Sequence, residues 1–145
     1  MFTIDIKIRR APSEVFAFLE DVVRAPMWYS AVKRVTPTDN GEAAIGRRYI
    51  FERDLGSRSV ENEVEITELK RPTAFTIESK SGPTPFVYRY SLNDENGTTH
   101  LRLDGEISGE GLPGLLSLAA PLASKAFEKG MRTNLATLKK LIETS

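Results

Sequence analysis

In "FVYRYSLNDENGTTHLRLDGEI", residues 86–107, apolar or aromatic residues occupy every second position on both sides of a single turn, "DENG". Alternation with a period of two is typical of a strand that buries one face. Two such strands joined by a short turn predict an antiparallel hairpin. The residues predicted to face inward are Phe86, Tyr88, Tyr90, Leu92, Leu101, Leu103, Gly105 and Ile107.

The same period of two extends through the earlier part of the chain. Turn-forming residues such as "DLGS", "KRP" and "SGPTP" separate the runs, so consecutive strands are expected to be antiparallel neighbours. The first strand is expected at residues 2–8, where Phe2, Ile4, Ile6 and Ile8 share a face. The six later runs lie near residues 31–36, 47–55, 58–69, 74–80, 86–92 and 99–107.

Two short helical segments are expected after the first strand, and one long helix at the end of the chain. Pro12 suits the first turn of a helix, and a second short segment spans 22–28. Residues 122–143 would form a helix of roughly 33 Å, with Pro121 limiting its extension. Its apolar stripe is Phe127, Met131, Leu135, Leu138 and Ile142. We therefore predict one α+β domain over residues 1–145.

Composition excludes several classes of protein. The chain has 145 residues, 40% of them hydrophobic, and its 20 basic residues balance its 20 acidic ones. Nucleic-acid binding is disfavoured because it usually needs a basic excess. No apolar run is long enough for a membrane span, and the absence of cysteine excludes disulfides and thiolate sites. We expect a cytoplasmic protein with no cofactor and no metal.

The order of elements resembles the helix-grip fold of the START and pollen-allergen (SRPBCC) superfamily. More narrowly, the chain is similar to the polyketide cyclase/dehydrase and lipid-transport family. The segments that carry this resemblance are "APSEVFAFLEDVVRAPMW", "IGRRYIFE", "EVEITELKRPTAFTIES", "GTTHLRLDGE" and "NLATLKKLIE". The resemblance implies a seven-stranded antiparallel sheet wrapped around the long terminal helix, with a ligand pocket between them.

Strand parity and this resemblance together give a set of candidate ligand-binding residues. Arg53 and Asn62 share a face with apolar neighbours, so they are candidate anchors for a ligand carboxylate or carbonyl. The alternatives are that Arg53 lies near a strand end and reaches solvent, and that the aromatic residues are simple core. The full set is Trp28, Phe51, Arg53, Asn62, Val64, Tyr88, Tyr90, Leu103 and Leu122.

Two other groups of residues are predicted to lie outside any site. His100, the only histidine, has the parity of the solvated face, so it is not expected to act as a base. Glu61, Glu63 and Glu65 alternate with apolar residues and are expected to form a solvated row.

Two functions remain open at this stage, with a third as a lesser alternative. The first is binding of a small hydrophobic molecule, such as a lipid, polyketide or other ring compound. The second is a cyclase or dehydratase acting on such a molecule in the same cavity. We favour non-catalytic binding, because no inward carboxylate or histidine is predicted and tyrosine is a weak base near neutral pH. A groove for a partner protein would require a large exposed apolar patch.

Overall fold

The computed structural model describes residues 1–108 and 120–145, with the side chains of 120–123 excepted. One seven-stranded sheet has the order β1-β7-β6-β5-β4-β3-β2, and every neighbouring pair is antiparallel. The predicted meander is therefore confirmed, and the structure adds the first strand beside the last. The strands are β1 Phe2–Ile8, β2 Val32–Pro37, β3 Arg48–Leu55, β4 Arg58–Lys70, β5 Ala74–Ser81, β6 Phe86–Glu95 and β7 Thr98–Ile107.

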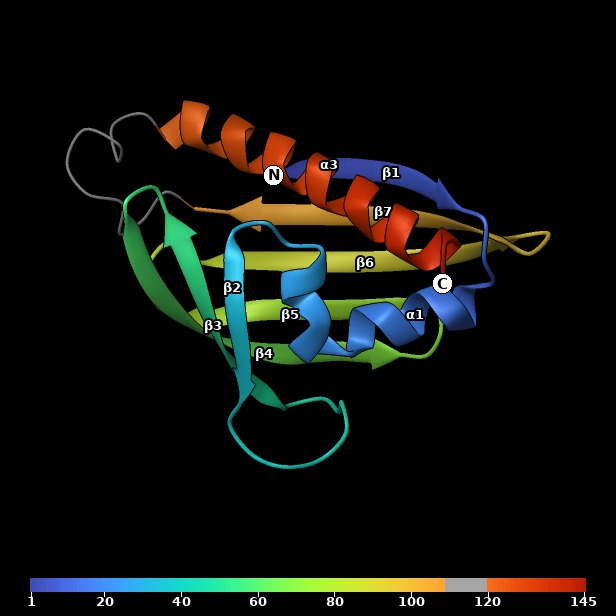
Figure 1. Ribbon diagram of the computed structural model, residues 1–145, viewed down its shortest axis with the longest axis horizontal. Coiled ribbons are helices and arrows are strands. Elements are labelled where there is room, and N and C mark those ends of the chain that lie inside the picture. Colours follow the sequence, from blue (N-terminus) through green and yellow to red (C-terminus); the bar gives the residue numbers. More distant parts are fainter. Residues whose placement is uncertain (109–119) are drawn as a thin grey trace.

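The helices cover one face of this sheet. Helix α1 spans Pro12–Glu20, the 3₁₀ helix η1 spans Val22–Met27, and α3 spans Ala120–Glu143. Figure 1 shows α3 crossing the sheet obliquely, with its C-terminal end near α1. Pro121 lies in the first turn of α3, where its missing N–H costs no helical hydrogen bond, so it starts the helix. The predicted helix-grip architecture is observed.

The core lies between the inner face of the sheet and these helices. Met131 and Leu135 of α3 are buried, as the helical periodicity predicted. They belong to one buried cluster with strand residues that the alternation predicted to face inward. The most deeply buried strand residues include Ile4, Phe51, Val64, Ile66, Phe75, Tyr90, Leu101 and Leu103.

The outer face of the sheet is polar, as predicted. His100 lies there and its Nε2 is 2.8 Å from Asp5 Oδ1. The glutamate row is also on this face, and Arg48 of β3 bonds two of its members, Glu63 at 2.8 Å and Glu65 at 2.9 Å. The row is thus partly neutralised by a cation from the neighbouring strand. Within the described ranges, no helix is both long enough and apolar enough to cross a membrane.

Candidate functional site

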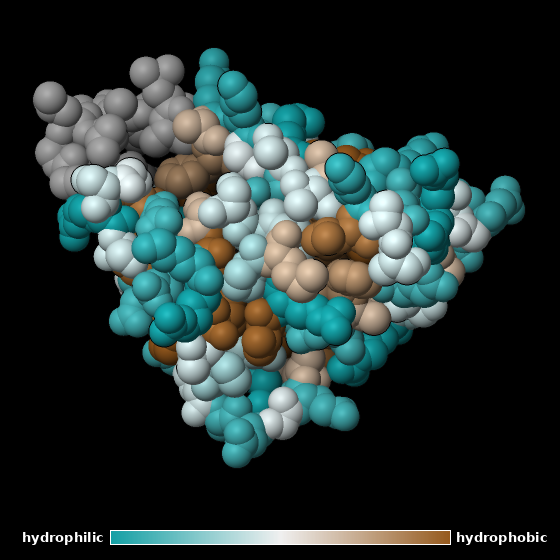
Figure 2. Space-filling model, in the orientation of Figure 1, coloured by the Kyte–Doolittle hydropathy of each residue, from teal (hydrophilic) through white to brown (hydrophobic). Residues whose placement is uncertain are grey.

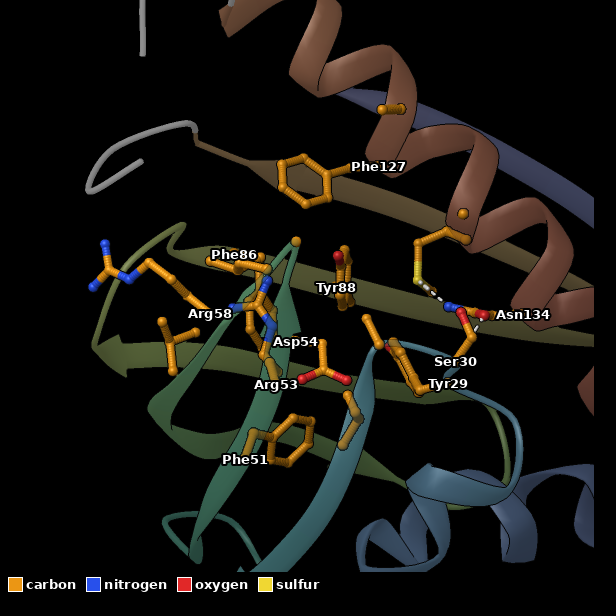
Figure 3. A pocket seen from close by; sticks show the side chains of 18 of the residues that line it. Tyr29, Ser30, Phe51, Arg53, Asp54, Arg58, Phe86, Tyr88, Phe127 and Asn134 are labelled. Atoms are coloured by element: carbon orange, nitrogen blue, oxygen red, sulfur yellow. Dashed lines mark hydrogen bonds between the residues drawn. The ribbon is translucent and has the colours of Figure 1, made fainter. Parts of the chain in front are cut away.

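A cavity of about 530 Å³ lies between one end of the sheet and α3. Its size is in the range of cavities that hold small organic ligands. Figure 3 shows its walls, which come from the η1–β2 connection, β2, β3, β4, β6 and α3. On the face shown in Figure 2, apolar residues reach the surface near the middle and are surrounded by hydrophilic ones. The polar lining residues of the cavity are Tyr29, Ser30, Arg53, Asp54, Ser57, Arg58, Tyr88 and Asn134.

Aromatic rings form the sheet side of this cavity. Phe86 and Tyr88 are two positions apart on β6, so their side chains share a face, and their rings stack with centroids 4.8 Å apart. Phe51 from β3 lies 6.3 Å from Phe86, and Tyr29 lies 6.3 Å from Tyr88. The rings present a wide apolar surface on which a flat or branched apolar molecule could pack.

Tyr29 closes the inner end of the cavity. Its hydroxyl lies 2.8 Å from the hydroxyl of Tyr90, and this pair is buried. Behind it is a second hollow of about 10 Å³, which Trp28 and Tyr90 border together with Tyr29 and Phe51. That space is about the size of a single water molecule. Tyr29 and Phe51 therefore separate the ligand-sized cavity from a small hollow in the core.

Arg53 brings a positive charge into the apolar cavity. Its side chain is buried, with the residue only 6% exposed, and its guanidinium carbon lies 5.1 Å from the centre of the Phe86 ring. Arg53 Nη1 donates a hydrogen bond to Asn62 Oδ1 at 2.7 Å. Burial lowers the pKa of the Arg53 guanidinium, but an arginine remains charged at neutral pH. The alternative in which Arg53 reaches solvent is not observed.

Asn62 is itself fixed by the turn between β5 and β6. Its Nδ2 lies 3.1 Å from the carbonyl oxygen of Ser81 and 2.8 Å from that of Pro83. Gly82 lies between them at φ +99°, and a Cβ there would be 2.3 Å from the Glu61 carbonyl oxygen. A glycine at this position allows the turn to approach Asn62 so closely.

Helix α3 closes the opposite side of the cavity. Asn134 Oδ1 accepts a hydrogen bond from the backbone N–H of Ser30 at 3.1 Å, which ties the helix to the η1–β2 connection. Met131 is 3% exposed and adds its thioether to the wall. Gly130 also lines the cavity, and a Cβ there would meet no described atom within 4 Å beyond its chain neighbours and its own helix backbone. The missing side chain at Gly130 therefore leaves space that belongs to the cavity.

Among the described lining residues, Asp54 is the one with a carboxylate, and it is partly exposed to solvent. Its side chain is 44% exposed and its Oδ1 lies 3.1 Å from Lys33 Nζ. Among the described residues, no group of three or more acidic or histidine side chains is placed to hold a metal ion.

The chain matches, over residues 1–143, a family model described as "Polyketide cyclase / dehydrase and lipid transport". It belongs to this family. A search of curated proteins by sequence gave no match. The polyketide cyclase/dehydrase and lipid transport family is thus the identity that the sequence itself supports.

Solved structures share the fold at low sequence identity. A START superfamily protein from Mycobacterium smegmatis has a TM-score of 0.80 at 11% identity, covering 99% of this chain and 97% of that one. The Zhui aromatase/cyclase from a Streptomyces species also has a TM-score of 0.80 at 11% identity, covering 98% and 92%. A protein from Thermus thermophilus has a TM-score of 0.80 at 13% identity, covering 97% and 94%.

The structure places the candidate residues of this family member in three groups. Phe51, Arg53 and Tyr88 line the cavity, whereas Trp28 and Tyr90 border only the small hollow behind Tyr29. The third group lies outside both spaces: Asn62 stands behind Arg53, and Val64 and Leu103 are fully buried core residues. The side chain of Leu122 falls outside the described residues.

Sequence reasoning also missed several lining residues. Tyr29 and Ser30 follow η1 in a segment with no strand period, so parity could not assign them. Gly130 did carry a signal, because a glycine beside the apolar stripe of a helix marks a place where the helix cannot fill its surroundings. Met131 was predicted to be structural, and it also borders the cavity.

Proposed function

We propose that this protein binds one small, mainly apolar molecule in the cavity between the sheet and α3. The observation that carries this proposal is a space of about 530 Å³ whose lining surface is mainly apolar, with an aromatic wall formed by Phe51, Phe86 and Tyr88. Burial of apolar ligand surface would supply affinity at about 25 cal/mol per Å², and the polar groups would set the orientation. Membership of a family described by lipid transport as well as by cyclisation supports the same proposal.

Non-catalytic binding is favoured because the described residues of the cavity include no group suited to act as a base near neutral pH. Burial raises the pKa of Tyr88 to about 12, and it raises the pKa of Tyr29 well above its usual value. Asp54 is partly exposed to solvent and pairs with Lys33, while His100 lies on the far face of the sheet. A general base must reach the proton that it removes, and His100 cannot do so from that face.

A cyclase-type reaction in the same cavity is the second candidate. It is favoured by the Tyr88 hydroxyl and the Arg53 guanidinium, since two hydrogen-bond donors in one apolar space can polarise a carbonyl. The fold shared with the Zhui aromatase/cyclase supports the same candidate. Mass spectrometry of a molecule that co-purifies with the protein separates the two: a guest recovered unchanged after prolonged incubation supports binding alone.

The binding proposal is tested by filling the cavity from the helix. Gly130→Phe places a ring in the open space at Gly130, and replacing a helical glycine should leave the helix at least as stable. The exposed neighbour Lys129→Phe adds the same ring outside the cavity. Titration with the neutral fluorescent probe N-phenylnaphthylamine should show saturable binding to the wild type and to Lys129→Phe.

Gly130→Phe should weaken binding of this probe by about tenfold or more, which corresponds to about 1.4 kcal/mol, with an unchanged or higher Tm. Wild-type affinity in a folded Gly130→Phe protein would show that the cavity is not the binding site. Failure of the wild type to bind N-phenylnaphthylamine would count against the proposal as well.

A further inference from the structure

Arg53 is a buried cation that has no anionic partner among the described residues. It is 6% exposed, yet no described carboxylate forms an ion pair with it. Asp54, its neighbour along β3, points its carboxylate to Lys33 at 3.1 Å. A buried charge without a counter-charge is unfavourable, so its presence in a ligand-sized cavity indicates a use.

The contacts that Arg53 does make fix its orientation without neutralising it. Asn62 Oδ1, a neutral acceptor, takes one N–H at 2.7 Å, and Asn62 is in turn held by the carbonyl oxygens of Ser81 and Pro83. The Phe86 ring lies against the guanidinium at 5.1 Å. A guanidinium has five N–H donors, so most of them remain for another acceptor.

Tyr88 provides a second donor beside this cation. It lines the same cavity, is 5% exposed, and its hydroxyl bonds to no other residue in the described part of the chain. Figure 3 shows the Arg53 and Tyr88 side chains entering the cavity from β3 and β6. The pKa of about 12 keeps the Tyr88 hydroxyl protonated, so it can donate to a ligand oxygen.

We infer that the guest is an organic monoanion with an aromatic or alicyclic body, whose carboxylate or equivalent anionic oxygen group pairs with Arg53. This inference rests on the proposed function, because it needs the guest to occupy the cavity. The planar edge of a guanidinium matches two oxygens of one carboxylate, and such paired, charge-assisted bonds are among the strongest in proteins. The apolar body would then lie against Phe86, Tyr88 and Phe51.

The test uses two fluorescent probes with the same ring skeleton, of which one is anionic. Anilinonaphthalene sulfonate carries an anionic group that N-phenylnaphthylamine lacks. We expect the wild type to bind the anionic probe roughly tenfold more tightly than the neutral one. Arg53→Met should abolish this preference while keeping affinity for the neutral probe, and Arg53→Lys, which keeps the charge but not the planar fork, should be intermediate.

The matched control is Arg48→Met. Arg48 is on the same strand but on the outer face of the sheet, where it bonds Glu63 and Glu65, and its loss changes the net charge equally. Arg48→Met should keep the wild-type preference. The effect of Arg53 would then be local and not a consequence of total charge.

The outcomes separate this inference from the function that it deepens. If both probes bind equally well to the wild type, or if folded Arg53→Met keeps the preference, the inference fails and the binding proposal stands. If neither probe binds to the wild type, the binding proposal itself fails. Should Arg53→Met not fold, the side-chain Nε–H resonance of Arg53 in wild-type protein gives the answer: a shift with the sulfonate alone supports the inference, and no shift overturns it.

Discussion

Asn62 of β4 holds the Arg53 guanidinium of β3 in place, with Arg53 Nη1 2.7 Å from Asn62 Oδ1. The register explains this contact, because Phe51 is opposite Asn62 and Arg53 is opposite Val60, which makes Arg53 and Asn62 diagonal neighbours on the inner face. Asn62 also reaches the β5–β6 turn. One buried amide therefore links the cation in the cavity to the backbone of a third strand.

Asn62→Ala should be strongly destabilising. It would remove the acceptor for Arg53 and the donor to Ser81 and Pro83, leaving buried polar groups unpaired, and we expect a loss on the order of 2–4 kcal/mol in the free energy of unfolding. Ser79→Ala removes two long contacts, one from Asn62 Nδ2 at 3.2 Å and one to the Ser81 carbonyl oxygen at 3.3 Å, and should cost less than about 1 kcal/mol. Urea unfolding of both variants gives the comparison. Equal losses would show that Asn62 is not the organising residue.

Glu143 is expected to make the folded protein less stable as the pH falls into the acidic range. Its carboxylate accepts hydrogen bonds from Lys139 Nζ at 2.7 Å and from the Arg9 backbone N–H at 2.8 Å, so the end of α3 is tied to the segment after β1. The bond from Lys139, followed by that from Arg9, lowers the pKa of Glu143 from 4.5 to about 2. Because the folded pKa is the lower one, the unfolded chain takes up the proton first as pH falls.

Glu143→Gln should therefore lower the Tm at neutral pH, and its deficit should shrink between pH 4.5 and about pH 2. Glu61→Gln, at an exposed position on the outer face, is the control and should leave the Tm unchanged across this range. Thermal melts at several pH values test this. A deficit of Glu143→Gln that is constant down to pH 2 would contradict the role assigned to this carboxylate.

The tyrosines are expected to make the folded protein less stable as the pH rises into the alkaline range. The chain has four of them, and burial is the main cause that raises the pKa of each, to about 12 for Tyr88. Because the pKa is higher in the folded state, the unfolded chain ionises first as the pH rises. The contribution of the tyrosines to the free energy of unfolding is therefore complete below pH 10 and is lost above it. Tyrosinate absorbance should thus rise together with the loss of circular dichroism. A tyrosine that ionises below pH 10 in folded protein would contradict the burial described here.

The strands and their inner face could be predicted from the sequence because alternation is a local property. Each of the turns between residues 37 and 98 interrupts the alternation and so marks where one strand ends and the next begins. Because the turns are short, consecutive strands had to be antiparallel. Arg53 stood out in the same way, as a charged residue with inward parity, and the structure places it in the cavity.

The position of the cavity along the sheet could not be predicted in this way. The alternation assigns a residue to one face of the sheet. It does not show at which point along the strand the helix separates from the sheet and leaves a space. Val64 and Leu103 have the same parity as Tyr88, yet they are fully buried in the core, whereas Tyr88 reaches the cavity. The space depends on Gly130 and on the Tyr29–Tyr90 contact, and the latter joins residues 61 positions apart.

The methionine methyl groups offer the most direct test of the claim that a guest occupies this cavity. The chain has three methionines. Met131 lines the cavity and is 3% exposed, whereas Met1 and Met27 are on the surface with 84% and 55% exposure. In a methyl-labelled protein, each resonance can be assigned by a methionine-to-leucine substitution. Titration with N-phenylnaphthylamine should shift the Met131 methyl resonance and leave those of Met1 and Met27 in place; a shift at Met27 or Met1 with Met131 unchanged would contradict the account.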